Sequence, residues 1–241
     1  PNKWGKNFGV ILDRCLSTTV GFQATLFFEK LGIIVVNSSL VSQNCDNKFL
    51  TSLILNQHKI PTVPFALVFT EKEAKEAIEQ LGGYPVVIKP VSGSWGRLLA
   101  KVNDEDSLEG IIEQKQVLGS PIQKALYIQK YVKKPGRDIR AVVINNKTIC
   151  AIYRETSHWI TNTARGAEAK NCPIDAKLSS ICSKTSKAIG GGILGVDIFE
   201  TKQGYVVNEV NHTMEYKNVQ RVTGINIANK ILEFCQEVSK S

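Results

Sequence analysis

The sequence predicts a mixed fold, in which an α/β unit is followed by an α+β unit with an antiparallel sheet. The first observation is a strand–helix–strand start, in which apolar runs from Phe8 to Leu12 and from Ile33 to Val36 flank the helically spaced stretch Thr18 to Leu31. The second is a later series of short apolar runs that follow one another across polar turns, as in an antiparallel meander. The third is the stretch Gly195 to Lys217, which has the pattern of a hairpin.

The α/β start predicts a parallel, doubly wound sheet, because parallel strands need a crossover connection such as a helix. We expect this unit to be truncated, with its first strand before Pro1. Asp13 and Arg14 follow the first apolar run, at the carboxyl end of a strand, where open parallel sheets place their ligands.

The middle of the chain places helices and strands around a small turn that contains glycine. Val86 to Pro90 is a buried strand with Lys89 at its exit, and Leu98 to Val102 is the strand after the turn. The turn, Ser92 to Arg97, presents backbone N–H groups to which a phosphate can bind, although a tight hairpin turn has the same composition. Helices are expected over Asn44 to Gln57, Glu71 to Gln80 and Ser107 to Leu118.

The following strands are expected to form the antiparallel meander. The stretch Ser157 to Cys172 then lacks apolar periodicity and carries Asn162, Arg165 and Lys170, which predicts a mobile loop that binds an anion; the alternative is an ordinary surface loop. The meander strands are Tyr127 to Val132, Ala141 to Ile144 and Thr148 to Arg154, and helices are expected over Ile174 to Gly190 and Ile225 to Val238.

Three oxygen-bearing side chains interrupt the apolar runs of the Gly195 to Lys217 hairpin: Asp197, Glu209 and Asn211. A carboxylate is costly to bury unless it is paired or binds a metal. Glu209 and Asn211 are two residues apart and so lie on one face of their strand. Such oxygens could hold Mg²⁺, which completes its coordination with water and phosphate. The alternative is a polar edge hairpin with exposed acids.

Composition limits the class of protein. The chain has 241 residues, of which 43% are hydrophobic and 22% charged, as in a globular enzyme. No run of about 18 apolar residues is present, so no membrane partner is expected. The net charge of +8 predicts an anionic partner. The basic residues are dispersed along the chain, which disfavours nucleic acid as that partner. Six scattered cysteines without a CxxC pair indicate a reducing, cytoplasmic location.

The order of these parts resembles that of the ATP-grasp carboxylate–amine ligases. It runs from Lys48 on a helix through Lys89, the glycine turn and the YIQKYV strand to Arg137-Asp138-Ile139-Arg140, and ends at Asp197 and the NEVN string. Within these ligases, HWITNTARG (158–166) and NEVNHTMEYKN (208–218) look like the LysX/ArgX branch. The resemblance implies an ATP-grasp fold with an incomplete N-terminal pre-ATP-grasp domain at 1–40, a central subdomain with the phosphate loop at 41–130, and a C-terminal subdomain with the metal site at 131–241.

The resemblance also implies the reaction and its partners. ATP, with two Mg²⁺ ions expected, would phosphorylate the C-terminal glutamate side chain of a small acidic amino-group carrier protein (LysW-like), and the amino group of glutamate or α-aminoadipate would attack the acyl phosphate. A homo-oligomer is expected. The implied ATP-binding residues are Lys48, Lys89, Ser92, Gly93, Ser94, Trp95, Gly96, Gln129, Lys130, Tyr131, Val132 and Asp138. The implied catalytic residues are Arg140, Arg154, Asn162 and Arg165; the implied substrate residues are Arg14, Gly21, Phe22, His158, Asn211, Thr213 and Lys217.

The amino-acid substrate is predicted from the segment after the first strand. Arg14-Cys15-Leu16-Ser17 departs from the pattern of the α-aminoadipate enzymes, and Gly21-Phe22 looks like the glutamate-using type, which favours glutamate and the arginine pathway. One methylene changes binding by only about 1–3 kcal/mol, so α-aminoadipate (the lysine pathway) and dual specificity remain as alternatives.

Two further alternatives belong to other classes. One is a module that binds nucleotide without catalysing ligation. The complete set of candidate phosphate and metal ligands disfavours it: Lys48, Lys89, Asp197, Glu209 and Asn211. The other is a ligase that adds glutamate to a different acceptor, which the NHTMEYKN string (211–218) disfavours.

Overall fold

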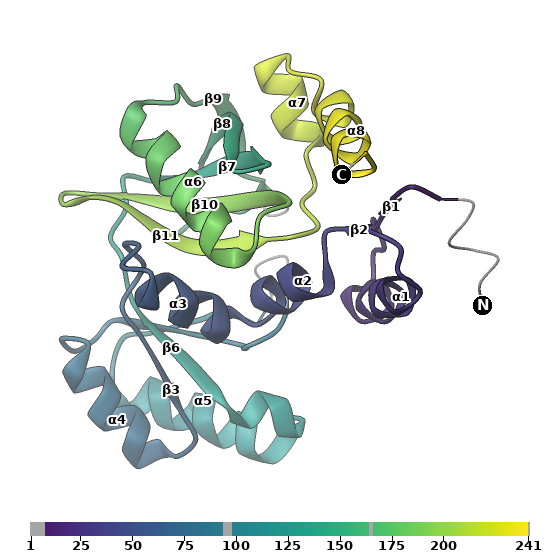
Figure 1. Ribbon diagram of the computed structural model, residues 1–241. Helices are drawn as coiled ribbons and strands as arrows, with labels where there is room; N and C mark the ends of the chain where they lie inside the picture. Colours follow the sequence, from purple (N-terminus) through teal and green to yellow (C-terminus); the bar gives the residue numbers. More distant parts are fainter. Residues whose placement is uncertain (1–7, 94–97, 164–165, 241) are drawn as a thin grey trace.

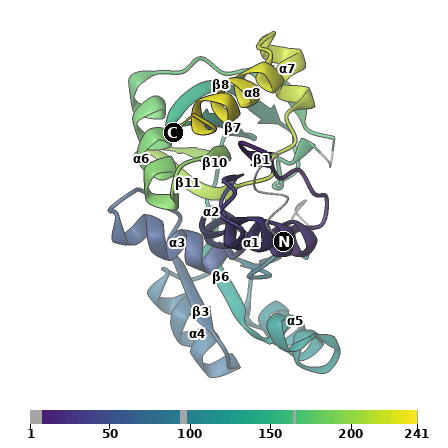
Figure 2. The same ribbon diagram turned by 45° about the vertical axis from the view of Figure 1, so that its right-hand side comes forward.

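The computed structural model describes residues 8–93, 98–163 and 166–240, which form three sheets with helices packed on them (Figure 1). A two-stranded sheet at the N-terminus has the order β1-β2, a four-stranded sheet has the order β3-β6-β4-β5, and a five-stranded sheet has the order β11-β10-β7-β8-β9. Figures 1 and 2 show the four-stranded sheet at one end of the molecule, with α2 and α3 between it and the five-stranded sheet. The mixed architecture, an α/β unit followed by antiparallel sheets, is the one predicted.

The N-terminal unit has the predicted strand–helix–strand order. β1 (Ile11–Leu12) pairs in parallel with β2 (Val35–Val36), and α1 (Thr18–Lys30) crosses between them. Ser17 begins the helix because its side-chain oxygen accepts a hydrogen bond from the backbone N–H of Val20. Both strands are shorter than the apolar runs that predict them.

The helix expected over Asn44 to Gln57 is interrupted at Asn47. α2 (Ser39–Asp46) ends there and α3 (Lys48–Gln57) begins. Asn47 has an extended backbone, and its side-chain oxygen accepts the N–H of Leu50 at 3.0 Å, so it caps α3 instead of continuing α2. The break makes Lys48 the first residue of α3.

The four-stranded sheet contains one strand that was predicted elsewhere and one that was not predicted. Tyr127 to Val132, expected to start the meander, is β6 and pairs with β3 and β4 of this sheet. β3 follows a proline-rich segment at 61–64, which hides it in the sequence. The elements are β3 (Phe65–Val68), α4 (Glu71–Gln80), β4 (Val86–Lys89), β5 (Ala100–Val102), α5 (Glu105–Leu118), η1 (Pro121–Lys124) and β6 (Leu126–Lys130).

The five-stranded sheet is antiparallel throughout and is covered on both faces. Alternate residues of β7 point to opposite faces: Ile139 and Val143 pack with α3 and α6, whereas Val142 and Ile144 pack with α7 and α8. β9 and α7 were not predicted, because one is a short charged edge strand and the other a single short helix. The elements are β7 (Arg137–Ile144), β8 (Lys147–Glu155), β9 (Glu168–Asn171), α6 (Ala176–Ile189), β10 (Ile193–Thr201), β11 (Gly204–Asn211), α7 (Lys217–Thr223) and α8 (Ile227–Val238).

One buried side chain, Asn37, joins the N-terminal unit to the five-stranded sheet. Its amide nitrogen donates to the carbonyl oxygens of Ile193 and His212 at 2.8 and 2.7 Å, and its oxygen accepts the N–H of Ile193 at 2.7 Å. These bonds hold the start of β10 and the segment after β11 against the end of β2. None of the helices in the described part of the chain is long and apolar enough to cross a membrane.

Replacing Asn37 with Ala should lower the free energy of unfolding by about 2–4 kcal/mol, because three hydrogen bonds disappear and buried backbone groups lose their partners. Chemical denaturation of the purified protein measures this change. The exposed Asn56 on α3 provides the control, since Asn56→Ala should change stability by less than about 0.5 kcal/mol. Equal effects of the two substitutions would contradict the role assigned to Asn37.

Candidate active site

Strand register brings four charged residues into direct opposition in the five-stranded sheet. Asp138 on β7 lies opposite Arg154 on β8, and Arg140 on β7 lies opposite Asp197 on β10. On the next strand, Glu209 of β11 lies opposite Asp197. Opposite charges that face one another across antiparallel strands attract, whereas like charges repel.

The four residues form a closely bonded group, which we call the Asp–Arg cluster (Asp138, Arg140, Arg154 and Asp197). Arg154 donates two hydrogen bonds to Asp138, both at 2.7 Å, and lies 3.1 Å from Asp197. Arg140 donates two to Asp197, one of them from Nη2 at 2.9 Å. Arg154, Asp138 and Asp197 are each no more than 5% exposed, so their charges are satisfied by one another and not by water.

Burial and pairing act in opposite directions on these groups. Burial alone would raise the pKa of the Asp197 carboxyl, but the charges of Arg140 and Arg154 outweigh it and hold that pKa below its usual value. Burial alone would lower the pKa of Arg154, and its two aspartate partners raise it instead. Pairing therefore favours the charged forms of Asp197 and Arg154.

A cavity of about 660 Å³, which we call the hinge cavity, opens beside the chain segment that leaves β6. Among the residues implied for ATP, those that line it are Lys89, Gln129, Lys130, Tyr131, Val132 and Asp138. The Lys130 ammonium is directed away, because a Cβ placed on Gly82 would lie 2.9 Å from it.

A second, larger cavity of about 1380 Å³, which we call the arginine cavity, lies between the N-terminal unit and the five-stranded sheet. The residues implied for catalysis, substrate or metal that line it are Arg14, Arg140, Arg154, Asn162, Asp197, Glu209, Asn211 and Thr213, together with Lys48 and Gly93. Arg154, Asn162, Asp197 and Glu209 line both cavities and therefore form their common wall.

Two buried lysines approach this common wall. Lys89, at the end of β4, donates to Asn208 Oδ1 at 2.9 Å, and burial lowers the pKa of its ammonium to about 8. Lys48 lies 3.4 Å from Glu209 and donates to the carbonyl oxygen of Gly93. Both lysines are less than 10% exposed; Lys89 lines the hinge cavity and Lys48 lines the arginine cavity.

A β-bulge explains how Asn208 and Glu209, neighbours in sequence, both line the hinge cavity. Consecutive side chains of a regular strand point to opposite faces. Here the pairing of β10 with β11 shifts after Asp197, so that Glu209 opposes Asp197 and Val207 opposes Ile198. The extra residue, Asn208, re-aims the strand, as bulges near active sites do.

The residues predicted to bind Mg²⁺ fit a cation in their chemistry. Asp197 and Glu209 supply carboxylates, and Asn211 supplies an amide on the same side of β11. The buried amide nitrogen of Asn211 has no hydrogen-bond partner, so no protein group holds this amide in one orientation. Asp197 is bonded to both arginines in this structure, and would have to share its oxygens with a cation.

Other implied residues lie away from both cavities or outside the described residues. Gly21 and Phe22 are on α1, and Ser92 donates to Asp46 at 3.0 Å. His158 is exposed and shapes its own turn by accepting the N–H of Ile160 at 3.0 Å. The exposed Lys217 begins α7. Ser94, Trp95, Gly96 and Arg165 lie outside the described residues.

Several cavity residues were not singled out from the sequence. Lys134 reaches the hinge cavity and donates to Thr161 Oγ1 at 2.7 Å, and Thr161 in turn donates to Asp138. Trp159 packs 6.5 Å from the ring of Tyr131 and lines the same cavity. The HWITNT string contains two of these residues, so the motif marked the right segment although not its individual side chains.

Two antiparallel sheets that enclose a cavity, with lysines and carboxylates at its inner end, are the architecture of an ATP-grasp enzyme. Comparison with known proteins gives the family. The RimK-like ATP-grasp domain matches residues 45–235, and the chain belongs to this family of ligases.

The relatives include enzymes of both predicted specificities. The chain is 40% identical to the "Alpha-aminoadipate--LysW ligase LysX" of Saccharolobus solfataricus over 95% of this chain and 83% of that protein. It is 32% identical to the "Glutamate--LysW ligase ArgX" of Sulfurisphaera tokodaii over 98% of this chain and 84% of that protein. A solved RimK-domain ATP-grasp protein from Sphaerobacter thermophilus superposes with a TM-score of 0.78 at 25% identity, covering 95% of this chain and 82% of that one. The predicted LysX/ArgX family is confirmed, whereas the preference for ArgX is not.

Replacing Asp138 with Ala should lower the free energy of unfolding by about 3–5 kcal/mol, because it leaves the buried Arg154 without its principal partner. Glu168→Ala is the matched control, since Glu168 contacts Lys170 on the surface at 3.7 Å and should contribute less than about 1 kcal/mol. Urea unfolding curves measure both. If Asp138→Ala were as mild as the control, the Asp–Arg cluster would not be a stabilising unit.

Proposed function

We propose that this protein is an ATP-dependent carboxylate–amine ligase that acts on the C-terminal glutamate side chain of an acidic, LysW-like carrier protein. The observation that carries the proposal is the common wall. Arg154, Asn162, Asp197 and Glu209 face the hinge cavity on one side and the larger arginine cavity on the other. A group transferred from one bound substrate to the other would pass these residues.

The nucleotide is assigned to the hinge cavity. Backbone groups at 129–132 would hold the adenine, and Lys48 and Lys89 would neutralise phosphate charge, which is the main requirement of phosphoryl transfer. Asp197, Glu209 and Asn211 would hold Mg²⁺, which would supply charge neutralisation at the transferred phosphate when bound. The two lysines are already ordered, whereas Asp197 would have to share its oxygens between the arginines and the cation.

The carrier's carboxylate and the amino acid are assigned to the arginine cavity. The carboxylate oxygen would attack the γ-phosphorus, giving an acyl phosphate and ADP. The amine would then attack the acyl carbon, phosphate would leave with the electrons of the C–O bond, and the amine would lose a proton. Arg140 and Arg154 have the geometry to bind phosphate or carboxylate oxygens in pairs, and the net charge of +8 suits an acidic carrier.

Glutamate is the amino acid we propose, on the basis of the Gly21-Phe22 pair, with α-aminoadipate as the alternative. The overall identities, 40% to LysX and 32% to ArgX, do not add to the support for glutamate. Because the two substrates differ by one methylene, a single site that accepts both is consistent with the same residues.

The test is a carrier-charging assay with Mg·ATP, a LysW-like carrier and each amino acid offered separately, read as the mass of the carrier. The proposal predicts an increase equal to the amino acid minus water, together with one ADP per charged carrier. A mass increase with α-aminoadipate alone would overturn the choice of glutamate. No increase with either amino acid, from a protein that binds ATP, would overturn the ligase proposal.

ATP binding should weaken above pH 8, because the ammonium of Lys89 loses its proton there. Its pKa is lowered to about 8, so the ammonium is mostly charged at pH 7, half charged at pH 8 and mostly neutral at pH 9. For one such proton, the dissociation constant of Mg·ATP should rise about fivefold between pH 8 and pH 9.

Isothermal titration calorimetry measures this profile, with Lys89→Arg as the control. Arginine stays charged throughout this pH range, so the variant should show a flatter dependence than the wild type. Parallel profiles for the two proteins would contradict the assignment of Lys89 to the nucleotide.

A further inference from the structure

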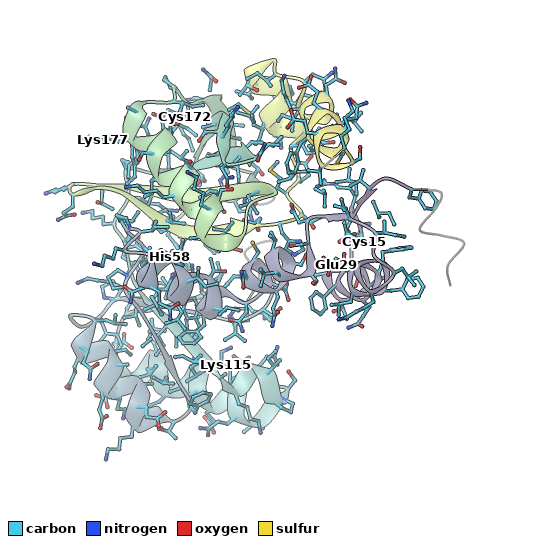
Figure 3. All side chains as sticks on the ribbon, viewed as in Figure 1. Cys15, Glu29, His58, Lys115, Cys172 and Lys177 are labelled. Atoms are coloured by element: carbon cyan, nitrogen blue, oxygen red, sulfur yellow. The ribbon has the colours of Figure 1, made fainter. Side chains whose placement is uncertain are left out.

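The loop between β1 and α1 forms one wall of the arginine cavity. Arg14, Cys15 and Leu16 line it, opposite the segment at 212–215. Arg14 spans the gap by donating from Nη2 to the carbonyl oxygen of Met214 at 2.9 Å, and its guanidinium lies 5.4 Å from the centre of the Tyr216 ring. Figure 3 labels Cys15 in this loop, beside α1. The position of the loop therefore determines the shape of the cavity.

Asp13 holds the base of this loop, although it does not line the cavity. Its backbone N–H donates to the carbonyl oxygen of Val36 at 2.8 Å, which extends the pairing of β1 with β2. Its side-chain Oδ1 accepts the N–H of Cys15 at 2.8 Å, so the backbone turns sharply on either side of Arg14. A hydrogen bond to the Asp13 carboxylate, aided by its charge, also raises the pKa of the Cys15 thiol, as expected for groups in contact.

Gly21 leaves the space that the Asp13 carboxylate occupies. It lies in the first turns of α1, where its own N–H bonds to the carbonyl of Ser17, and glycine is otherwise a poor residue for a helix. A Cβ at this position would lie 2.6 Å from Asp13 Oδ2 and 3.1 Å from Oδ1. Any other residue would therefore displace the carboxylate that holds the loop.

We propose that Asp13 and Gly21 are a pair of positioning residues for the amino-acid substrate, acting through Arg14 and its loop. The inference rests on the proposed ligase function and extends it to residues that touch neither cavity. The ligand concerned is an amino acid whose carboxylate binds the N–H groups of Arg14 that Met214 leaves available.

The test compares four variants in the carrier-charging assay: Gly21→Ala, Asp13→Ala, Asp13→Asn and the double variant Asp13→Ala/Gly21→Ala. Gly21→Ala and Asp13→Ala should each raise the KM for the amino acid about tenfold or more, as expected for loss of a hydrogen bond to a charged group. The kcat and the dissociation constant of Mg·ATP should stay within about twofold of the wild type, because the hinge cavity is untouched.

Two relations between the variants separate positioning from general damage. Asp13→Asn keeps an oxygen that can accept the N–H of Cys15, so its KM for the amino acid should stay close to the wild-type value. The double variant should be no worse than Asp13→Ala alone, because the added methyl has room once the carboxylate is gone. Gly110→Ala is the matched control: Gly110 is also helical, nothing lies within 4 Å of its Cβ position, and the KM should not change.

An unchanged KM for the amino acid in both Gly21→Ala and Asp13→Ala would overturn the inference. So would an equal rise in the KM for the amino acid and in the dissociation constant of Mg·ATP. If Gly21→Ala fails to fold, the KM of Asp13→Ala, which only removes atoms, decides the question. A different result would contradict the proposed function: the wild-type protein would bind ATP but charge no carrier. The positioning pair fails when the wild type charges the carrier and the variants do so with the same KM.

Discussion

Two aspartates and two arginines meet in the interior of the five-stranded sheet, and burial makes each of them depend on the others. Their formal charges cancel, and Asp138, Arg154 and Asp197 have almost no contact with water. A single buried charge without a partner costs several kcal/mol, so the pairing constrains the structure around it. β7, β8 and β10 must keep the register that places Asp138 opposite Arg154 and Asp197 opposite Arg140.

The rest of the molecule builds two compartments on either side of this cluster. The four-stranded sheet contributes Lys89 and the hinge segment, whereas the N-terminal unit contributes the loop that carries Arg14. Asn37 and Arg14 attach that unit to the start of β10 and to the segment after β11 through backbone carbonyl groups, so the N-terminal unit is held in place by specific bonds. An enzyme that joins two substrates benefits from such fixed walls, because polar groups that are already oriented need little reorganisation during the reaction.

Local patterns in the sequence predicted much of the fold. The apolar run ending at Lys89, the hairpin that carries Asp197 and Glu209, and the strand–helix–strand start all depend on neighbouring residues. Partners distant in sequence were not predictable in this way: β6 joins another sheet than expected, and Asp197 bonds to Arg140, 57 residues away. Gly21 shows the same limit, because its sequence neighbours cannot reveal that a carboxylate eight positions earlier fills the space of its missing side chain.

The proposed ligase requires the hairpin carboxylates and the cluster to receive a metal–nucleotide complex at the common wall. A crystal structure with Mn²⁺ and a non-hydrolysable ATP analogue tests it most directly, since Mn²⁺ is identified by anomalous scattering. We expect a metal about 2.0–2.3 Å from oxygens of Asp197, Glu209 and Asn211, with adenine in the hinge cavity. A bound nucleotide whose metal lies elsewhere, with Asp197 still bonded only to Arg140 and Arg154, would contradict it.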